Sequence, residues 1–175
     1  TIREHKGRLA GLTMAYVGDG ANNMAHSYLL GGALAGMHVR IGTPERHLPS
    51  GEVLGRARDI AAGTGGSVLV TRDPRACVAG ADVVLTDTWV SMGMEEEKAQ
   101  RQGAASPFQD YCVTSELMRR ASPEAIFLHC LPAYRGHEVT AEVIDGPQSV
   151  VWDEAENRLH AQKALLSFLI EASRR

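Results

Sequence analysis

The chain has 175 residues, of which 44% are hydrophobic and 22% are charged, and its formal net charge is −3 at pH 7. A chain of this length is the usual size of one domain and can bury roughly 70% of its unfolded surface. This composition excludes disordered and fibrous classes. A weak negative charge without any basic run also lacks the electrostatic footprint of nucleic-acid binding. The default ligand is therefore a small molecule.

The sequence also gives no sign of a membrane or of secretion. Its apolar stretches are too short or too interrupted for a bilayer span, and the charged N-terminal stretch TIREHKGRLAG lacks the apolar core of a signal peptide. Three cysteines, Cys77, Cys112 and Cys130, stand far apart without a C-x-x-C pair. This pattern favours reduced thiols in the cytoplasm over disulfides or a structural zinc site.

Short β-prone runs alternate with longer helical patterns along the whole chain. In chain order, we predict a strand at 12–18, a helix at 22–36, a strand at 37–43, a helix at 51–65, strands at 67–71 and 82–87, a solvated helix and loop at 94–103, a strand at 125–130, a shorter strand at 149–152 and a last helix from about Asp153. This alternation predicts a single α/β domain. Its core is a doubly wound, Rossmann-like parallel sheet of about five strands with helices on both faces.

Three polar segments each follow a predicted strand: GDGANN (18–23), TDTWVSMG (86–93) and HCLP (129–132). In open α/β sheets, ligands bind beyond the carboxyl ends of the strands, where the strand order reverses. If the strand order is 3-2-1-4-5, the ends of the first and fourth strands flank that crevice and the fifth lies beside it. The three segments are then expected to converge on one pocket.

The segment GDGANN lies where a dinucleotide-binding fingerprint would lie. Asn23, however, stands where that fingerprint requires its third glycine. Asparagine at a helix start can donate to a carboxylate, and the helix dipole adds to the attraction. Asn22 can instead simply cap the helix. Both interpretations stay open at this stage.

The segment TDTWVSMG places Asp87 one residue past a predicted strand. A carboxylate there can bind an ammonium group, and Ser91 can hydrogen-bond a polar ligand. The alternative is an Asx-type turn with Trp89 and Met92 in the core.

The segment HCLP ends the fifth predicted strand, because Pro132 cannot continue it. Cys130 could be a small buried hydrophobe, and His129 a hydrogen-bonded core histidine. A thiol at a ligand crevice near cations would instead have a lowered pKa. Backbone carbonyls left unpaired before Pro132 could accept from a ligand's amide group.

Four segments together, GDGANNMAHS, TDTWVSMGMEEE, FLHCLPAYRGHEV and WDEAENRLHAQKALL, resemble the second half of the aspartate/ornithine carbamoyltransferase family in order and spacing. Aspartate-specific members typically carry HPLP in place of HCLP and lack the SMG loop, so ornithine is favoured over aspartate. Putrescine and acetylated ornithine stay as less favoured alternatives. The family's first half, with its Ser-x-Arg-Thr phosphate loop and His-Pro-x-Gln segment, has no counterpart here. The resemblance therefore implies an ornithine-binding domain spanning 1–175, inactive alone.

The resemblance also implies roles for the residues of an amino-acid site. Asn23, with Asn22 beside it, would bind the α-carboxylate end of L-ornithine. Asp87 would engage the amino group, and Ser91 and Met92 would complete the site.

For the reaction centre, the resemblance implies that Cys130 and Leu131 hold the carbamoyl amide of carbamoyl phosphate. Arg158 would polarise the carbamoyl group, so Cys130 and Arg158 are the predicted catalytic residues. No metal or other cofactor is expected. The intact enzyme is expected to be a homotrimer without nucleic-acid or membrane partners, with its last helix packed on the missing half.

Two further hypotheses stay open. The first is a nucleotide-binding module, against which Asn23 argues. The second is a stand-alone interaction or regulatory domain; an exposed apolar patch where a missing half would dock favours the transferase fragment instead.

Overall fold

The computed structural model describes residues 1–90, 93, 95–103 and 105–174, so the predicted site residues Ser91 and Met92 lie outside the described residues. Its centre is a five-stranded, all-parallel sheet with the order β3-β2-β1-β4-β5. The strands are β1 Thr13–Val17, β2 His38–Gly42, β3 Ser67–Thr71, β4 Val83–Thr86 and β5 Ile126–His129. The predicted strand order and the five main predicted strands are confirmed.

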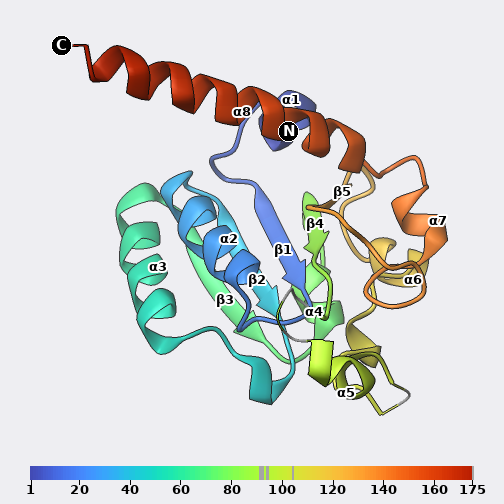
Figure 1. Ribbon diagram of the computed structural model, residues 1–175. Helices are drawn as coiled ribbons and strands as arrows, with labels where there is room; N and C mark the ends of the chain where they lie inside the picture. Colours follow the sequence, from blue (N-terminus) through green and yellow to red (C-terminus); the bar gives the residue numbers. More distant parts are fainter. Residues whose placement is uncertain (91–92, 94, 104, 175) are drawn as a thin grey trace.

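Helices cover both faces of this sheet, as predicted (Figure 1). The α-helices are α1 Ile2–Lys6, α2 Asn23–Leu34, α3 Gly51–Thr64, α4 Pro74–Val78, α5 Lys98–Gln102, α6 Ser115–Met118, α7 Ala141–Ile144 and α8 Val151–Ala172. Short 3-10 turns lie at η1 Glu45–His47, η2 Glu95–Glu97 and η3 Gln109–Tyr111. The predicted helices at 22–36 and 51–65 correspond to α2 and α3.

Alternation along the strands divides the core into two layers. In β1, Ala15 and Val17 pack on one face with side chains from α4, α6 and α7, whereas Met14 and Tyr16 pack on the other with α2 and α3. Successive strand residues point to opposite faces, so a central strand that is covered on both sides can bury every position. The four residues of β4 are all buried for this reason.

Helix α2 lies close to the sheet because Gly32 faces it. A Cβ atom at this position would lie 2.5 Å from a methyl carbon of Val39 and 2.8 Å from the terminal carbon of Met14. Gly32 lies in the last turn of α2, so the close approach sets the distance between the C-terminal part of this helix and strands β1 and β2.

The prediction of a short strand at 149–152 is wrong. Ser149 forms only an isolated bridge with Phe127, and α8 begins at Val151, two residues before the predicted start. The acidic residues Asp153 and Glu154 lie in the first turn of α8, where carboxylates stabilise the positive end of the helix dipole.

Helix α8 crosses the top of the molecule beside α1 and then projects beyond the sheet (Figure 1). The two helices are joined where His5 Nε2 lies 2.7 Å from Asp153 Oδ2. Large apolar side chains along the projecting part are each more than half exposed: Leu159, Leu165, Leu166, Phe168, Leu169 and Ile170. Despite this apolar content, none of the helices in the described part of the chain combines the length and hydropathy needed to cross a bilayer.

Candidate functional site

The three polar segments meet at the carboxyl edge of the sheet, as the strand order requires. Asn22 follows β1, Asp87 follows β4 and Cys130 follows β5. The Nδ2 group of Asn22 donates to Asp87 Oδ2 at 3.3 Å, and the Cys130 thiol donates to Asp87 Oδ1 at 3.2 Å. Asp87 therefore joins segments that are more than 40 residues apart in the chain.

Asn22 has two structural roles. Its side-chain oxygen accepts from the backbone N–H of Ala25 at 2.8 Å, so it caps α2, as one of the two interpretations of this segment proposed. Its amide nitrogen also donates to the Tyr16 hydroxyl at 3.0 Å as well as to Asp87. Capping fixes the side chain, and the fixed amide then orients the Asp87 carboxylate.

Asp87 is buried and retains capacity for a ligand. Its carboxylate accepts from Asn22, from Cys130 and from the backbone N–H of Thr88 at 2.7 Å. A carboxylate offers about four acceptor positions, so three donors leave room for one more. The alternative interpretation of this segment is correct for Trp89, which is 1% exposed in the core.

Of the two interpretations of Cys130 that the sequence left open, the one with a lowered pKa is wrong. Burial raises the pKa of this thiol to about 12, and the negative charge and hydrogen-bond acceptance of Asp87 add to the rise. A thiol near a carboxylate stays protonated because deprotonation would place two negative charges side by side. Cys130 thus acts as a half-buried hydrogen-bond donor at neutral pH.

This arrangement predicts how the thiol reacts. The thiolate is the nucleophilic form, so Cys130 should be alkylated slowly by iodoacetamide at pH 8. Asp87→Asn removes one cause of the raised pKa, and each unit of decrease gives about tenfold more thiolate. We expect faster alkylation of Cys130, measured by peptide mass spectrometry.

Cys112 in the same sample is the internal control. Burial raises the pKa of Cys112 to about 11, with a contribution from Glu138 and none from Asp87. Its rate should stay unchanged in Asp87→Asn. Equal acceleration of both cysteines would indicate local unfolding rather than loss of the Asp87 charge.

The backbone after β5 is held by a second set of contacts. The N–H of His129 donates to Glu154 Oε2 at 2.9 Å, which ties β5 to the first turn of α8. Leu131 follows with a left-handed φ of 55° and a cis bond to Pro132. Burial raises the pKa of Glu154, although donation from the His129 N–H opposes this rise. Glu154 was not predicted as a site residue from the sequence, even though it lies within the segment WDEAENRLHAQKALL.

Two other predicted residues lie at the border of this cluster. Asn23 is the first residue of α2 and is exposed beside Asn22. Arg158 is exposed on α8, one turn after Glu154, and its positive charge lowers the pKa of that carboxylate. Among the described residues, neither side chain hydrogen-bonds to Asp87 or Cys130. The structure therefore groups Asn22, Asp87 and Cys130 and leaves Asn23 and Arg158 outside that group.

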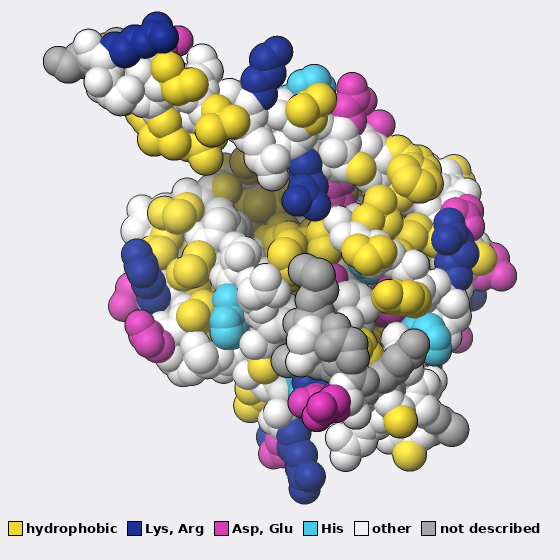
Figure 2. Space-filling model, in the orientation of Figure 1, with side chains coloured by type: hydrophobic (Ala, Val, Ile, Leu, Met, Phe, Trp, Pro, Cys, Tyr) yellow, Lys and Arg dark blue, Asp and Glu magenta, His cyan; other side chains and the backbone are white. Residues whose placement is uncertain are grey.

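A hollow of about 420 Å³ opens beside the cluster, beneath α8. Its floor consists of sheet residues including Met14, Leu85 and Leu128, and Tyr28 and Glu154 add polar atoms to its wall. Figure 2 shows hydrophobic side chains within this hollow and along the underside of α8. The Tyr28 hydroxyl is buried without a hydrogen-bond partner in the described part of the chain. Burial, followed by the charges of Glu154, Cys130 and Asp87, raises the pKa of Tyr28.

A buried ion pair anchors the segment that follows TDTWVSMG. The guanidinium of Arg101 donates to Asp19 Oδ2 at 2.6 Å and to the Trp89 carbonyl at 3.1 Å. Asp19 belongs to the GDGANN turn, so the pair ties α5 to the β1–α2 turn. His47 also approaches Asp19, and burial lowers the pKa of this histidine. Neither Asp19 nor Arg101 was singled out from the sequence.

One group of side chains near the site could offer metal ligands. Single atoms of Asp87, His129 and Cys130 lie within 4.8 Å of one another. The Cys130 thiol already donates to Asp87 Oδ1 at 3.2 Å. His129 Nδ1 already accepts from the backbone N–H of Leu131 at 2.9 Å. The group therefore fits a hydrogen-bonded cluster better than a metal centre.

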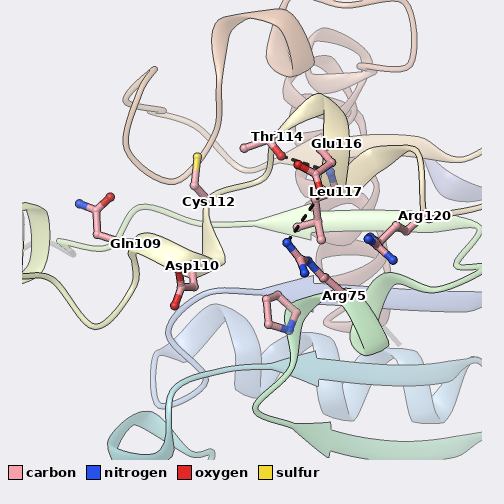
Figure 3. Close-up of a pocket in the computed structure, with 9 residues that line it drawn as sticks. Arg75, Gln109, Asp110, Cys112, Thr114, Glu116, Leu117 and Arg120 are labelled. Atoms are coloured by element: carbon pink, nitrogen blue, oxygen red, sulfur yellow. Dashed lines mark hydrogen bonds and ion pairs between the residues drawn. The ribbon is translucent and has the colours of Figure 1, made fainter.

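A separate hollow of about 130 Å³ lies between α4, η3 and α6 (Figure 3). Arg75 and Glu116 form an exposed ion pair across it at 3.7 Å. None of its lining residues belongs to the three converging segments. Because Arg75 and Glu116 pair with each other and the three converging segments do not reach this hollow, the edge of the sheet remains the candidate ligand site.

A doubly wound sheet with polar residues gathered at its switch point is the arrangement typical of α/β domains that bind small molecules. A family model for the aspartate/ornithine carbamoyltransferase Asp/Orn binding domain matches residues 10–169. The chain belongs to the aspartate/ornithine carbamoyltransferase family.

Individual relatives agree with this assignment. The chain is 65% identical over 173 residues to an ornithine carbamoyltransferase of Clavibacter sepedonicus, covering 99% of this chain and 55% of the relative. It is 64% identical over 174 residues to the ornithine carbamoyltransferase of Leifsonia xyli, with the same coverage. The solved ornithine carbamoyltransferase of Pyrococcus furiosus matches with a TM-score of 0.88 at 48% identity, covering 95% of this chain and 52% of that one. The chain spans about half the length of the relatives it matches.

Proposed function

We propose that residues 1–175 form the ornithine-binding domain of an ornithine carbamoyltransferase. The intact enzyme transfers the carbamoyl group of carbamoyl phosphate to the δ-amine of L-ornithine, giving L-citrulline, an intermediate of arginine biosynthesis, and phosphate. One observation carries this proposal: Asn22, Asp87 and Cys130 form a hydrogen-bonded cluster at the carboxyl edge of three neighbouring parallel strands. They belong to the segments on which the family resemblance rests.

The amino-acid part of ornithine binds at the β1 and β4 ends. Asn23 stands at the N-terminus of α2, a helix of 12 residues whose dipole attracts the α-carboxylate. Asn22 orients the Asp87 carboxylate, which accepts from the α-ammonium through its remaining acceptor position. Ser91 and Met92 complete the site from the segment after β4.

The reacting end of ornithine lies toward β5 and the hollow beneath α8. An alkylammonium has a pKa of about 10.4, so delivering the neutral amine at pH 7 costs about 4–5 kcal/mol unless the site lowers its pKa. The largely apolar floor of the hollow disfavours a charged ammonium and so lowers this cost. Holding the δ-nitrogen near the carbamoyl carbon makes the attack effectively unimolecular.

The carbamoyl group is held at the end of β5. The backbone of Cys130 and Leu131 accepts from its amide, and Arg158 on α8 stabilises the charge that develops on its oxygen. The protonated Cys130 thiol is not the nucleophile, since its pKa is raised to about 12. The attacking group is the amine of ornithine, and phosphate is the leaving group. The complementary half of the enzyme supplies the phosphate site.

The β1–α2 turn argues against the nucleotide-binding alternative. In a dinucleotide fingerprint the second glycine lets a pyrophosphate approach the backbone. Here Gly20 is packed internally, because a Cβ atom there would lie 2.8 Å from the His47 carbonyl oxygen and 2.9 Å from the Thr43 methyl group. The backbone N–H of Gly20 is also used, since it donates to Thr43 Oγ1 at 2.9 Å.

The exposed apolar face of α8 supports the transferase-fragment proposal over a stand-alone regulatory domain. Its side chains from Leu159 to Ile170 are uncovered by the described residues, and a soluble enzyme buries such a face. We propose that the carbamoyl-phosphate-binding half packs on this apolar face of α8 in the intact enzyme. The assembled enzyme is a cytoplasmic homotrimer in this proposal, without nucleic-acid or membrane partners.

Calorimetry with L-ornithine tests the proposal on the chain itself. We expect saturable binding of ornithine, and no comparable binding of NAD or L-aspartate. Protection from thermal unfolding by NAD but not by ornithine would support the nucleotide-binding alternative instead.

A further inference from the structure

Two ionisable side chains are completely buried behind the end of β5 and have no part in the proposed reaction. His129 and Glu138 are each 0% exposed, and Nε2 of the histidine lies 3.4 Å from Oε1 of the glutamate. Buried ionisable groups are costly unless they are paired. A pair in this place therefore calls for a function beyond filling the core.

The hydrogen bonds of His129 define its tautomer. The backbone N–H of Leu131 donates to His129 Nδ1 at 2.9 Å, so Nδ1 carries a lone pair. The ring proton then resides on Nε2, which faces Glu138 Oε1 at 3.4 Å but has no hydrogen-bond partner among the described residues, so the two side chains interact through their charges and dipoles. Glu138 Oε1 also accepts from the backbone N–H of Tyr134 at 2.6 Å. The pair thus spans the segment 130–134 and contacts its backbone near both ends.

The segment between these contacts needs support. Leu131 has a φ of 55°, a left-handed conformation that is unfavourable for residues other than glycine. Such a conformation persists when surrounding contacts hold it. The bond from the Leu131 N–H to His129 Nδ1 is the contact that acts directly on this residue.

We propose that His129 and Glu138 are positioning residues for the carbamoyl site. Glu138 fixes the Nε2–H tautomer of His129, and Nδ1 of His129 holds Leu131 in its left-handed turn. This inference rests on the proposed function, which assigns the backbone of Cys130 and Leu131 to the carbamoyl amide. Neither His129 nor Glu138 touches the substrate in this account.

The tautomer can be tested on the native chain by ¹⁵N NMR of the histidine rings. We expect His129 to show an unprotonated Nδ1 and a protonated Nε2. A protonated Nδ1 would overturn the proposal. This measurement does not depend on ornithine binding, so it separates a failure of this inference from a failure of the proposed function.

The positioning role is tested by two substitutions at the same residue in the intact enzyme. His129→Asn places a side-chain oxygen near the position of Nδ1 and keeps an acceptor for Leu131, whereas His129→Leu removes it. We expect His129→Leu to lower kcat/KM for carbamoyl phosphate roughly tenfold relative to His129→Asn, the size of one net hydrogen bond. KM for ornithine should differ little between them. Equal kinetic losses in both variants would mean that His129 only fills the core.

A second pair tests Glu138. Glu138→Gln keeps an oxygen that accepts from the Tyr134 N–H and faces His129 Nε2, and it should retain most of kcat/KM for carbamoyl phosphate. Glu138→Leu should lower kcat/KM for carbamoyl phosphate, and its NMR spectrum should show a mixture of His129 tautomers. A single native-like tautomer in Glu138→Leu would contradict the assigned role, whatever its activity.

Discussion

Arg101→Ala is expected to destabilise the fold by about 3–5 kcal/mol, the usual cost of leaving a buried charge without its partner. The Asp19 side chain is 4% exposed, and Arg101 is its guanidinium partner at 2.6 Å, whereas the His47 ring lies farther away at 3.6 Å. The substitution also leaves the Trp89 carbonyl without its donor. Urea denaturation, monitored by circular dichroism, measures the change in the free energy of unfolding.

Arg135→Ala is the matched control for this prediction. Arg135 pairs with Asp145 at 2.6 Å, as short a distance as in the buried pair, but both side chains are about half exposed. Exposed pairs contribute little because water and salt screen them. A loss of stability in Arg135→Ala as large as that in Arg101→Ala would show that burial does not set the cost.

Asp87→Asn is expected to weaken ornithine binding by roughly 1.5–3 kcal/mol, the contribution of a hydrogen bond to a charged group. This corresponds to a loss of roughly 10- to 150-fold in affinity. The substitution removes the negative charge that we propose binds the ammonium group, but it keeps a side-chain oxygen for the Thr88 N–H. Calorimetry with ornithine measures the change.

Asp110→Asn makes the same change of charge away from the crevice. Asp110 is exposed and lines the separate hollow beside η3. Ornithine affinity should stay the same in this variant. Unchanged affinity in Asp87→Asn as well would assign Asp87 a purely turn-forming role.

The sheet could be predicted from the sequence because each strand carries a local signal. Runs such as 82–87 and 125–130 are apolar and end at polar residues, and the loops between them allow parallel crossovers. The segment 149–152 has the same β-branched character but lies directly before the acidic first turn of α8. Tertiary packing favours the helix at this point, because Val151 is fully buried as the first residue of α8.

The site could be predicted only in part, because its electrostatics depend on partners distant in sequence. Because Asn22, Asp87 and Cys130 each follow a predicted strand, the sequence was enough to predict that they lie close together. The neighbour of Cys130, however, is a carboxylate 43 residues away rather than a cation, which reversed the expected pKa shift. Tyr28 carried no local signal, since one aromatic residue on an apolar helix face is typical of a core.

The environment of His129 could be predicted from the sequence, but its partner could not. The sequence allowed a hydrogen-bonded core histidine, and the structure confirms that interpretation. Its partner Glu138 was not predicted, because a glutamate in the charged segment RGHE normally faces solvent. Its burial follows from the return of the chain at Val139, which forms a bridge with Val113.

The most direct test of the central claim is citrulline formation by this chain with and without the complementary carbamoyl-phosphate-binding half. Both reactions contain ornithine and carbamoyl phosphate. We expect no citrulline from the chain alone and citrulline from the mixture, with a loss of activity when the chain carries Asp87→Asn. Citrulline formation by the chain alone would contradict the claim that it provides only the ornithine-binding part of the active site.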